Sequence, residues 1–147
     1  MLPSELTLVP VSLAQVLSKD GNRSAKDFFD FVIDGISLRE VLKTDDVAVL
    51  SDQWDSSDFA RQLLSEASGD QRLEGRAQIY GCRECLDIEC GGIAVSVTRV
   101  GDRVRWETFA KFWPDYEYDR FTFEPVLAGR YEFDLSQYRG TLQRFIG

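Results

Sequence analysis

The chain of 147 residues contains no histidine, and this absence restricts the possible catalytic mechanisms and metal ligands more than any other feature of its composition. Histidine is the commonest general base near neutral pH, a frequent metal ligand, and the usual partner that activates a serine or cysteine nucleophile. Catalysis that depends on an imidazole of this chain is therefore excluded. A metal site built from this chain must use cysteine or carboxylate ligands.

Several targeting and ligand-binding signals are also missing. No apolar run approaches the roughly 20 residues that a membrane-spanning helix needs. No basic segment precedes an apolar stretch at the N-terminus, so we expect no secretory signal. The glycine-rich phosphate-binding loop and the dinucleotide-binding fingerprint are absent as well. An odd number of cysteines without a signal sequence predicts a cytoplasmic protein in a reducing compartment.

The bulk composition predicts one globular domain over residues 1–147. Hydrophobic residues make up 44% of the chain and aromatic residues 12%, which is enough for a packed core and argues against disorder. A chain of this length buries roughly 70% of the surface of its unfolded state.

Acidic residues dominate the charge, which is −8 at pH 7. One segment holds nine acids against two bases, Arg39 and Lys43, and these acids are Asp27, Asp30, Asp34, Glu40, Asp45, Asp46, Asp52, Asp55 and Asp58. Such a block repels nucleic acid and attracts a basic protein over about one Debye length. Two interpretations stay open: a docking face for a basic partner, or a solvated surface that keeps the protein soluble.

Local patterns predict a series of short elements. Alternation of Phe29, Phe31 and Ile33 with other residues indicates a strand that ends at an Asp34-Gly35 turn. Three helices are expected before residue 80. The first follows Ser12, carries Leu13, Val16 and Leu17 and closes near Gly21; the second, over 38–42, is capped by Ser37; and the third begins at 55–58 and carries Phe59, Leu63 and Leu64. Two further strands are expected, over 47–50 and 77–80.

The hairpin over residues 93–109 is the clearest element, with a two-residue turn at Gly101-Asp102. The expected cross-strand pairs are Val100 with Arg103, Val97 with Trp106, and Val95 with Thr108. The face predicted to be buried carries Ile93, Val95, Val97, Val104 and Trp106.

Two strands over 121–123 and 131–133 and a terminal helix over 135–146, capped by Asp134 with Gln137, complete the pattern. Hairpins flanked by short helices predict an α+β fold. We expect a single domain in which an antiparallel sheet built from hairpins has three or four short flanking helices.

Three cysteines within nine residues, Cys82, Cys85 and Cys90, form the most distinctive motif of the chain. A Cys-x2-Cys spacing lets two thiolates reach one tetrahedral ion, which predicts half of a zinc site. Cys90 is the third candidate ligand, and Asp87 is the best-placed fourth. Two alternatives stay open: cysteines that pack as small apolar side chains at the base of the loop, and a redox role of Cys82 with Cys85.

Three segments of the chain resemble a group of small, largely uncharacterised bacterial proteins. They are Ile33-Asp34-Gly35-x-Ser37-Leu38, Tyr80-x-Cys82-x-x-Cys85-x-Asp87-x-x-Cys90-Gly91, and Gly101-Asp102-x-Val104-x-Trp106-x-x-Phe109. The segments are spread over about half of the chain, and Leu86 and Glu89 stand where that pattern has glycines. The resemblance implies a bacterial, cytoplasmic origin and carries no function with it.

Aromatic and acidic residues are interleaved without a clear period over residues 112–119. This segment is either a recognition loop, whose tryptophan and tyrosines anchor a basic protein surface, or a loop that folds its aromatics inward over the sheet. Carboxylate pairs such as Asp45/Asp46 and Asp115/Glu117 are expected by chance among 25 acids and predict no catalytic site.

The sequence thus predicts a non-enzymatic acidic binding protein, and most specifically an immunity-type inhibitor that neutralises a basic bacterial toxin. We expect no nucleic-acid or membrane partner and no cofactor other than zinc. The candidate partner-binding residues are Asp45, Asp46, Asp52, Asp55, Trp113, Asp115, Tyr116 and Glu117. The alternative is a small zinc-stabilised domain of unknown role whose ligands are Cys82, Cys85, Cys90 and Asp87.

Overall fold

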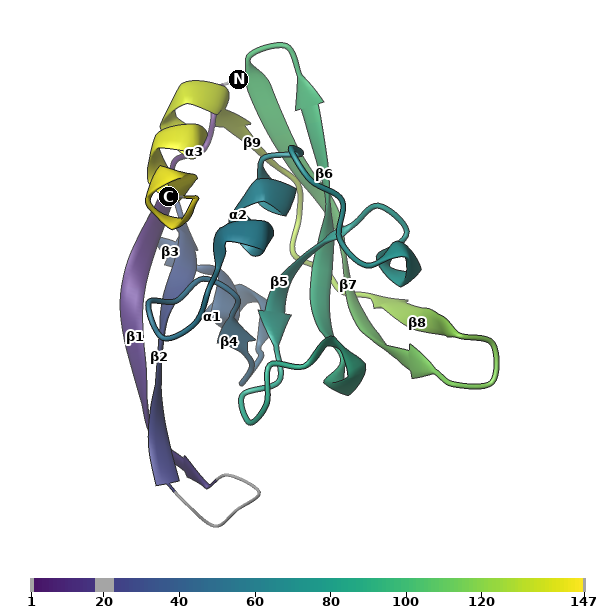
Figure 1. Ribbon diagram of the computed structural model, residues 1–147. Helices are drawn as coiled ribbons and strands as arrows, with labels where there is room; N and C mark the ends of the chain where they lie inside the picture. The colour runs from purple at the N-terminus through teal and green to yellow at the C-terminus, as the bar shows by residue number, and fades with distance from the viewer. Residues whose placement is uncertain (1, 18–22, 147) are drawn as a thin grey trace.

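The computed structural model describes residues 2–17 and 23–146, with side chains described over 2–13 and 26–146. The strands are β1 (Leu6–Leu17), β2 (Arg23–Ile33), β3 (Ile36–Ser37), β4 (Val47–Ala48), β5 (Ala77–Gly81), β6 (Gly92–Val100), β7 (Arg103–Asp115), β8 (Arg120–Pro125) and β9 (Tyr131–Asp134). The helices are α1 (Leu38–Leu42), α2 (Ser57–Leu63) and α3 (Leu135–Leu142), with short 3-10 turns η1 (Gln71–Leu73), η2 (Ile88–Cys90) and η3 (Gln143–Phe145). The predicted α+β class is confirmed (Figure 1).

The strands form two antiparallel sheets. The first has the order β1-β2-β3, and the second has the order β4-β5-β6-β7-β8, with β9 paired to the first half of β7. The backbone N–H of Phe29 in β2 donates to the carbonyl of Leu50 just beyond β4, at 2.8 Å, and joins the two sheets. Figure 1 shows α3 beside β1, and the hairpin of β7 and β8 on the opposite side of the molecule.

Three local signals of the sequence are confirmed. The Asp34-Gly35 pair has φ values of 51° and 81°, which is the conformation that a tight turn between β2 and β3 requires. Ser37 accepts a hydrogen bond from the N–H of Glu40 at the start of α1. Asp134 accepts one from the N–H of Gln137 at the start of α3, at 3.1 Å. Each cap satisfies a backbone donor that the helix itself leaves unpaired.

The helix predicted after Ser12 is wrong, because this segment belongs to strand β1. Pairing with β2 continues along the segment and places Leu13 opposite Lys26 and Val16 opposite Ser24. A helix of only about six residues has little stability of its own, so the hydrogen bonds to β2 decide the conformation. The predicted end of the helix near Gly21 lies outside the described residues.

The hairpin of β6 and β7 has the predicted register near its turn. Val100 pairs with Arg103, and Val97 pairs with Trp106. Gly101 has a φ of 61°, which a residue with a side chain adopts only at a cost. The face predicted to be buried does point into the main core.

The register shifts farther from the turn, and the predicted pair of Val95 with Thr108 is wrong. Ala94 pairs with Ala110, so that Thr108 and Phe109 of β7 oppose Val95 alone. Thr108 takes a φ of 59° in this β-bulge. A bulge bends and twists its strand. Beyond it, β7 leaves β9 and pairs with β8.

Trp106 lies at the centre of the main core. Its buried indole packs edge-to-face at centroid separations between 5.3 and 6.3 Å against the rings of Phe31, Phe109, Phe133 and Tyr138. The indole N–H donates to the Tyr138 hydroxyl at 2.9 Å, and that hydroxyl donates to the carbonyl of Leu63. One side chain thereby connects β7 with β2, β9, α2 and α3.

A second, smaller core lies on the other face of the β6–β7 hairpin. It consists of Leu73, Ala94, Phe112 and Phe121, with Ile88 and Phe123 packed against it. Ala94 belongs to this core while its neighbour Ile93 belongs to the main core, because successive residues of a strand point to opposite faces. The second core brings together η1, η2 and the β7–β8 hairpin.

Truncation of the buried indole tests this account of the main core. We expect Trp106→Ala to lower the free energy of unfolding by about 3–5 kcal/mol, as large aromatic deletions in cores do. Urea denaturation followed by circular dichroism measures the change. Val100→Ala, at a half-exposed position of the same hairpin, is the matched control, with an expected change within about 0.5 kcal/mol. Equal losses in the two variants would contradict the central position of Trp106.

Candidate functional site

The three cysteines lie together between β5 and β6. Their sulfur atoms lie within 4.8 Å of one another, and the Sγ atoms of Cys85 and Cys90 are 2.7 Å apart. Cys82 is half-buried, whereas Cys85 and Cys90 are exposed. This exposure does not support the interpretation in which Cys90 packs as a small apolar side chain.

Two tight turns bring the sulfurs together. The N–H of Leu86 donates to the carbonyl of Cys82 at 2.8 Å, and the N–H of Cys90 donates to the carbonyl of Asp87 at 2.9 Å. Leu86 takes a left-handed φ of 54° while its side chain packs against the main core. The turn therefore forms with a leucine at a position where the similar bacterial pattern has a glycine.

Gly91 and Gly92 are required where the cysteine loop re-enters the sheet. A Cβ atom on Gly91, which has a φ of 80°, would lie 2.5 Å from the carbonyl oxygen of Phe112. A Cβ atom on Gly92 would lie 2.2 Å from the carbonyl oxygen of Tyr80. The loop thus lies directly against β7 at the point where the β7–β8 hairpin begins.

The three sulfurs fit one soft metal ion, but the candidate fourth ligand does not join them. Zinc–sulfur bonds near 2.3 Å place tetrahedral thiolates about 3.8 Å apart, so the cluster is compact enough for one ion, but the Sγ atoms of Cys85 and Cys90, 2.7 Å apart, must separate by about 1 Å to bind it. Asp87 lies outside the group of converging ligand atoms. Its Oδ1 accepts the N–H of Glu89 at 3.0 Å and so caps η2.

Hydrogen bonding gives the two exposed thiols different acidities. Burial acts to raise the pKa of Cys85, but hydrogen bonds from the Cys90 thiol and the N–H of Asp87 outweigh it and lower that pKa. The bond to Cys85 raises the pKa of Cys90 to about 12. Cys85 is therefore the more acidic thiol of the pair, and Cys90 must lose a proton before it can bind a metal.

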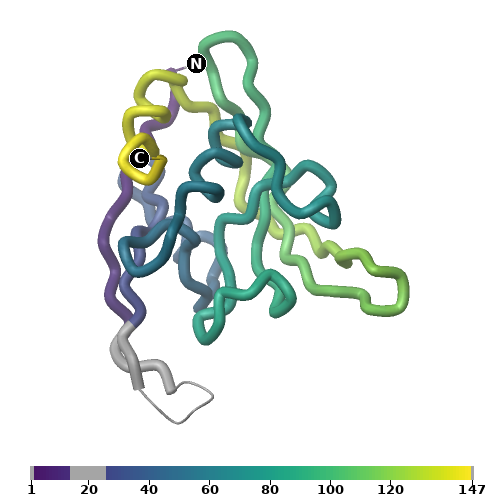
Figure 2. The backbone as a smooth tube through the Cα atoms, viewed as in Figure 1, coloured from purple at the N-terminus to yellow at the C-terminus, as the bar shows by residue number. Residues whose placement is uncertain are grey.

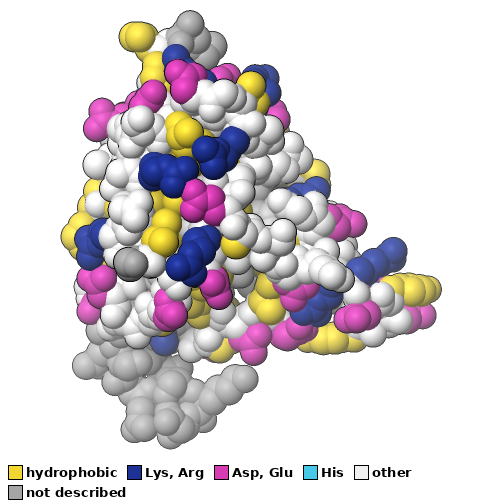
Figure 3. Space-filling view, turned by 45° about the horizontal axis from the view of Figure 1, so that its top comes forward, with side chains coloured by type: hydrophobic (Ala, Val, Ile, Leu, Met, Phe, Trp, Pro, Cys, Tyr) yellow, Lys and Arg dark blue, Asp and Glu magenta, His cyan; other side chains and the backbone are white. Residues whose placement is uncertain are grey.

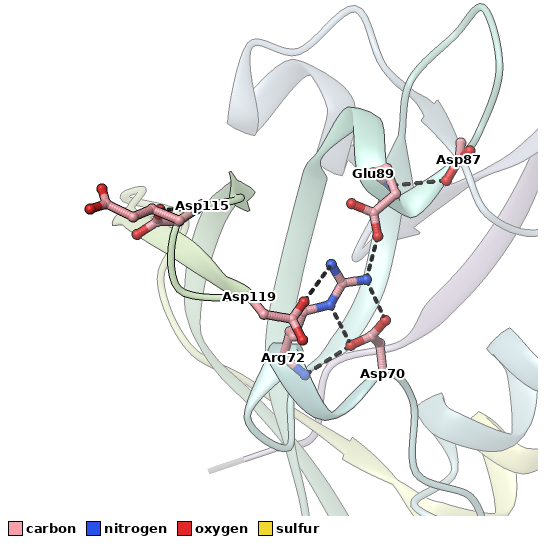
Figure 4. A network of polar contacts seen from close by, with 7 residues as sticks. Asp70, Arg72, Asp87, Glu89, Asp115 and Asp119 are labelled. Atoms are coloured by element: carbon pink, nitrogen blue, oxygen red, sulfur yellow. Dashed lines mark hydrogen bonds and ion pairs between the residues drawn. The ribbon is translucent and has the colours of Figure 1, made fainter.

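Arg72 connects the cysteine loop to two neighbouring segments (Figure 4). Its guanidinium forms ion pairs with Asp70, at 2.9 Å, and with Glu89 of the cysteine loop, and lies 3.9 Å from Asp119 in the β7–β8 turn. The hydrogen bond from Arg72 lowers the pKa of Asp70. The guanidinium also stacks over Phe121, 4.4 Å from the ring centroid. One arginine thus holds η1, η2 and the hairpin together.

The β7–β8 hairpin projects from the body of the molecule (Figure 2), and hydrophobic side chains are visible on its surface (Figure 3). Trp113, Tyr116 and Tyr118 are 43%, 77% and 63% exposed, whereas Phe112 is buried in the second core. The interpretation as a loop with its aromatics folded inward is therefore wrong for these three residues. The exposure favours the recognition-loop interpretation.

Residues 113–120 form the hairpin tip, and charged groups surround its exposed rings. Arg120 forms an ion pair with Asp115 at 3.2 Å and stacks over Tyr118, 4.8 Å from the ring centroid. Asp115 also accepts the N–H of Glu117 at 3.2 Å. With Asp119, the tip has three acids against one base.

The candidate partner-binding residues come from two separate segments of the chain. Trp113, Asp115, Tyr116 and Glu117 lie in the hairpin, whereas Asp45, Asp46, Asp52 and Asp55 lie in the connections on either side of β4. Asp52 pairs with Arg144 near the C-terminus at 3.1 Å, and Asp55 accepts the N–H of Ser57 at the start of α2. Burial raises the pKa of the half-buried Asp46.

Sequence reasoning missed Arg72, and it left Tyr118 and Asp119 out of the candidate partner-binding residues although both belong to the candidate recognition loop over residues 112–119. Tyr118 and Asp119 continue the aromatic and acidic pattern of the hairpin, so that pattern contained a signal for them. No sequence pattern pointed to Arg72, because its role depends on contacts with residues 17 and 47 positions away.

Comparisons with models of known protein families, with curated proteins and with solved structures find no match to this chain. Within the described residues, no helix is long and apolar enough to cross a membrane. The candidate site is therefore interpreted from its own geometry and chemistry.

Thiol labelling tests the proton arrangement in the cysteine loop. In reduced, metal-free protein at about pH 8, we expect iodoacetamide to modify Cys85 before Cys90, because a lower pKa gives the larger thiolate fraction. Peptide mass spectrometry at short reaction times measures the order, and faster modification of Cys90 would contradict it. A disulfide between Cys82 and Cys85 in protein exposed to air would support the redox alternative, and one between Cys85 and Cys90 would assign a redox role to a different pair.

Proposed function

We propose that this protein is a non-enzymatic binding protein whose β7–β8 hairpin docks onto a basic protein. The observation that carries the proposal is the outward exposure of Trp113, Tyr116 and Tyr118 on a projecting tip. Exposed apolar ring surface costs solvation free energy in the isolated protein, and clusters of it mark interaction sites. Tryptophan and tyrosine are also the residues most often found to dominate binding energy at protein interfaces.

The hairpin is held in place before any partner binds. Phe112 and Phe121 pack beneath it with ring centroids 4.9 Å apart. The guanidinium of Arg76 stacks on Phe123, 4.1 Å from the ring centroid, and Arg72 covers Phe121. A preformed tip loses less conformational entropy on binding than a loop that must first become ordered.

Charge selects the class of partner. The tip has an excess of acids, and the chain as a whole carries −8, so a basic protein is attracted and nucleic acid is repelled. The most specific form of the proposal is an immunity-type inhibitor that neutralises a basic toxin in the bacterial cytoplasm. Small size, acidity, the lack of histidine and the resemblance to small bacterial proteins support it.

Binding kinetics test the role of the hairpin. A partner is captured from the host with the wild-type protein, and association and dissociation rates are then measured at two salt concentrations. We expect Trp113→Ala and Tyr116→Ala each to raise the dissociation rate by about 30-fold or more, the change that a loss of about 2 kcal/mol at an interface centre produces. Association should slow as salt rises, because acidic groups of the tip attract the partner.

Charge reversal at two distant places provides the control. Glu117→Lys, in the tip, should lower the association rate, whereas Asp52→Lys changes the net charge equally on the far side of the molecule and should lower it less. Loss of the exposed Asp52–Arg144 pair costs little stability. If neither the tip variants nor salt changes the association and dissociation rates of the captured partner, the hairpin does not have this role.

The cysteine cluster favours a second candidate function, that of a small zinc-stabilised domain. Its specific observation is the convergence of three sulfur atoms within 4.8 Å. Cys82, Cys85 and Cys90 would hold the ion as thiolates. An ion that binds the folded chain more tightly than the unfolded chain stabilises the fold by mass action.

Metal analysis tests the second candidate. We expect protein purified without added metal to contain about one zinc per chain, and Cys85→Ser to lose the zinc and melt at a lower temperature. After treatment with a chelator, wild type and Cys85→Ser should melt at similar temperatures, which separates loss of metal from loss of packing. If all three thiols of the native protein react freely with a thiol reagent, and added zinc does not raise the melting temperature, this candidate is excluded.

A further inference from the structure

The cysteine cluster offers three metal ligands and no fourth. In the part of the chain that the structure describes, the sulfur atoms of Cys82, Cys85 and Cys90 form the only converging group of three or more potential ligands. Asp87 caps η2 and Glu89 is paired with Arg72, and neither of these residues nor Glu84 belongs to the converging group. An ion held by the three thiolates therefore keeps a coordination position that the described chain does not fill.

The exposure of the cluster makes that position accessible from solvent. Cys85 and Cys90 are both exposed, and only Cys82 is half-buried. Structural zinc sites are closed by four protein ligands, whereas sites that bind an external ligand keep one position open. A cluster in which two of the three cysteines are exposed matches the second type.

Charge decides which donor suits the open position. Three thiolates around a divalent ion leave one negative charge, and acids of the loop, among them Glu84 and Asp87, outnumber the single base Arg83. A further anionic donor adds to this negative charge and a neutral nitrogen donor does not, so the local charge favours the neutral donor. Imidazole is such a donor, and zinc binds it readily. This chain contains no histidine, so neither it nor a second copy of it can supply an imidazole side chain.

We propose that Cys82, Cys85 and Cys90 bind a zinc ion whose open position accepts an imidazole nitrogen from another protein. The proposal rests on the zinc site proposed above. It also joins the two candidate functions, because the cysteine loop lies against the start of the hairpin through Gly91 and is connected to its tip through Arg72. A basic protein docked on the hairpin is then close enough to offer a histidine side chain to the metal.

Cobalt(II) substitution tests the open position with the isolated full-length protein and free imidazole as the probe. Thiolate ligation of cobalt gives a charge-transfer absorption in the near ultraviolet, and the visible bands report the complete ligand set. We expect imidazole to shift the visible bands along a one-site saturation curve while the charge-transfer absorption persists. Acetate at the same concentrations should leave the visible bands unchanged.

A matched variant identifies the fourth position. Asp87→Asn keeps a side-chain oxygen that can cap η2, so it should respond to imidazole as the wild type does. If imidazole does not shift the visible bands of the wild type, the coordination position is not open. If imidazole shifts the bands of Asp87→Asn only, Asp87 is the fourth ligand in the wild type. Saturation at half an equivalent of cobalt per chain would also overturn it, since two chains would share one ion.

The zinc site itself can fail separately in the same experiment. If no charge-transfer absorption develops on addition of cobalt, the three thiols bind no metal, and the zinc candidate is overturned together with the open position. A normal charge-transfer absorption with unresponsive visible bands retains the zinc site and overturns the imidazole position alone.

Discussion

Burial of Trp106 is the constraint on which the rest of the structure depends. Its indole lies in the main core, where burial of the indole N–H without a hydrogen-bond acceptor would destabilise the fold. The Tyr138 hydroxyl supplies that acceptor and itself donates a hydrogen bond to the carbonyl of Leu63. Strand β7 is thereby fixed against α2 and α3. Because β7 continues past Trp106 into the projecting hairpin, the same burial determines where the tip points.

The second core makes the hairpin and the cysteine loop parts of one surface. Leu73 of η1 and Ile88 of η2 pack with Phe112 and Phe121 from the two strands of the hairpin. Each of these turns is too short to bury enough apolar surface alone, so their conformations depend on one another. Arg72 adds an electrostatic connection between them. A ligand that orders one of these segments therefore acts on the others, and the proposed metal and partner sites share this scaffold.

Most elements could be predicted from the sequence because their causes are local. The Asp34-Gly35 turn and the Ser37 cap depend on residues at most three positions apart. Convergence of the three thiols follows from their spacing in the same way. The strand after Ser12, the bulge at Thr108 and the contacts of Arg72 depend on segments that tertiary packing brings together. No pattern within a short window encodes such contacts.

The acidic block shows why net charge alone did not locate a docking surface. Asp30 is buried and accepts hydrogen bonds from Tyr80 and Ser37, each at 2.6 Å. Asp27, Asp34, Asp52, Asp55 and Asp58 likewise accept hydrogen bonds or form ion pairs within the chain. Carboxylates that satisfy internal donors stabilise the fold and are less available for direct contact with a partner, although their charge still contributes to long-range attraction. The carboxylate of Glu117 has no such internal contact in the described structure, and it lies beside exposed aromatic rings. The proposed recognition would therefore depend on which acids the fold leaves unpaired, and the hairpin tip combines such an acid with exposed aromatic surface that binding can bury.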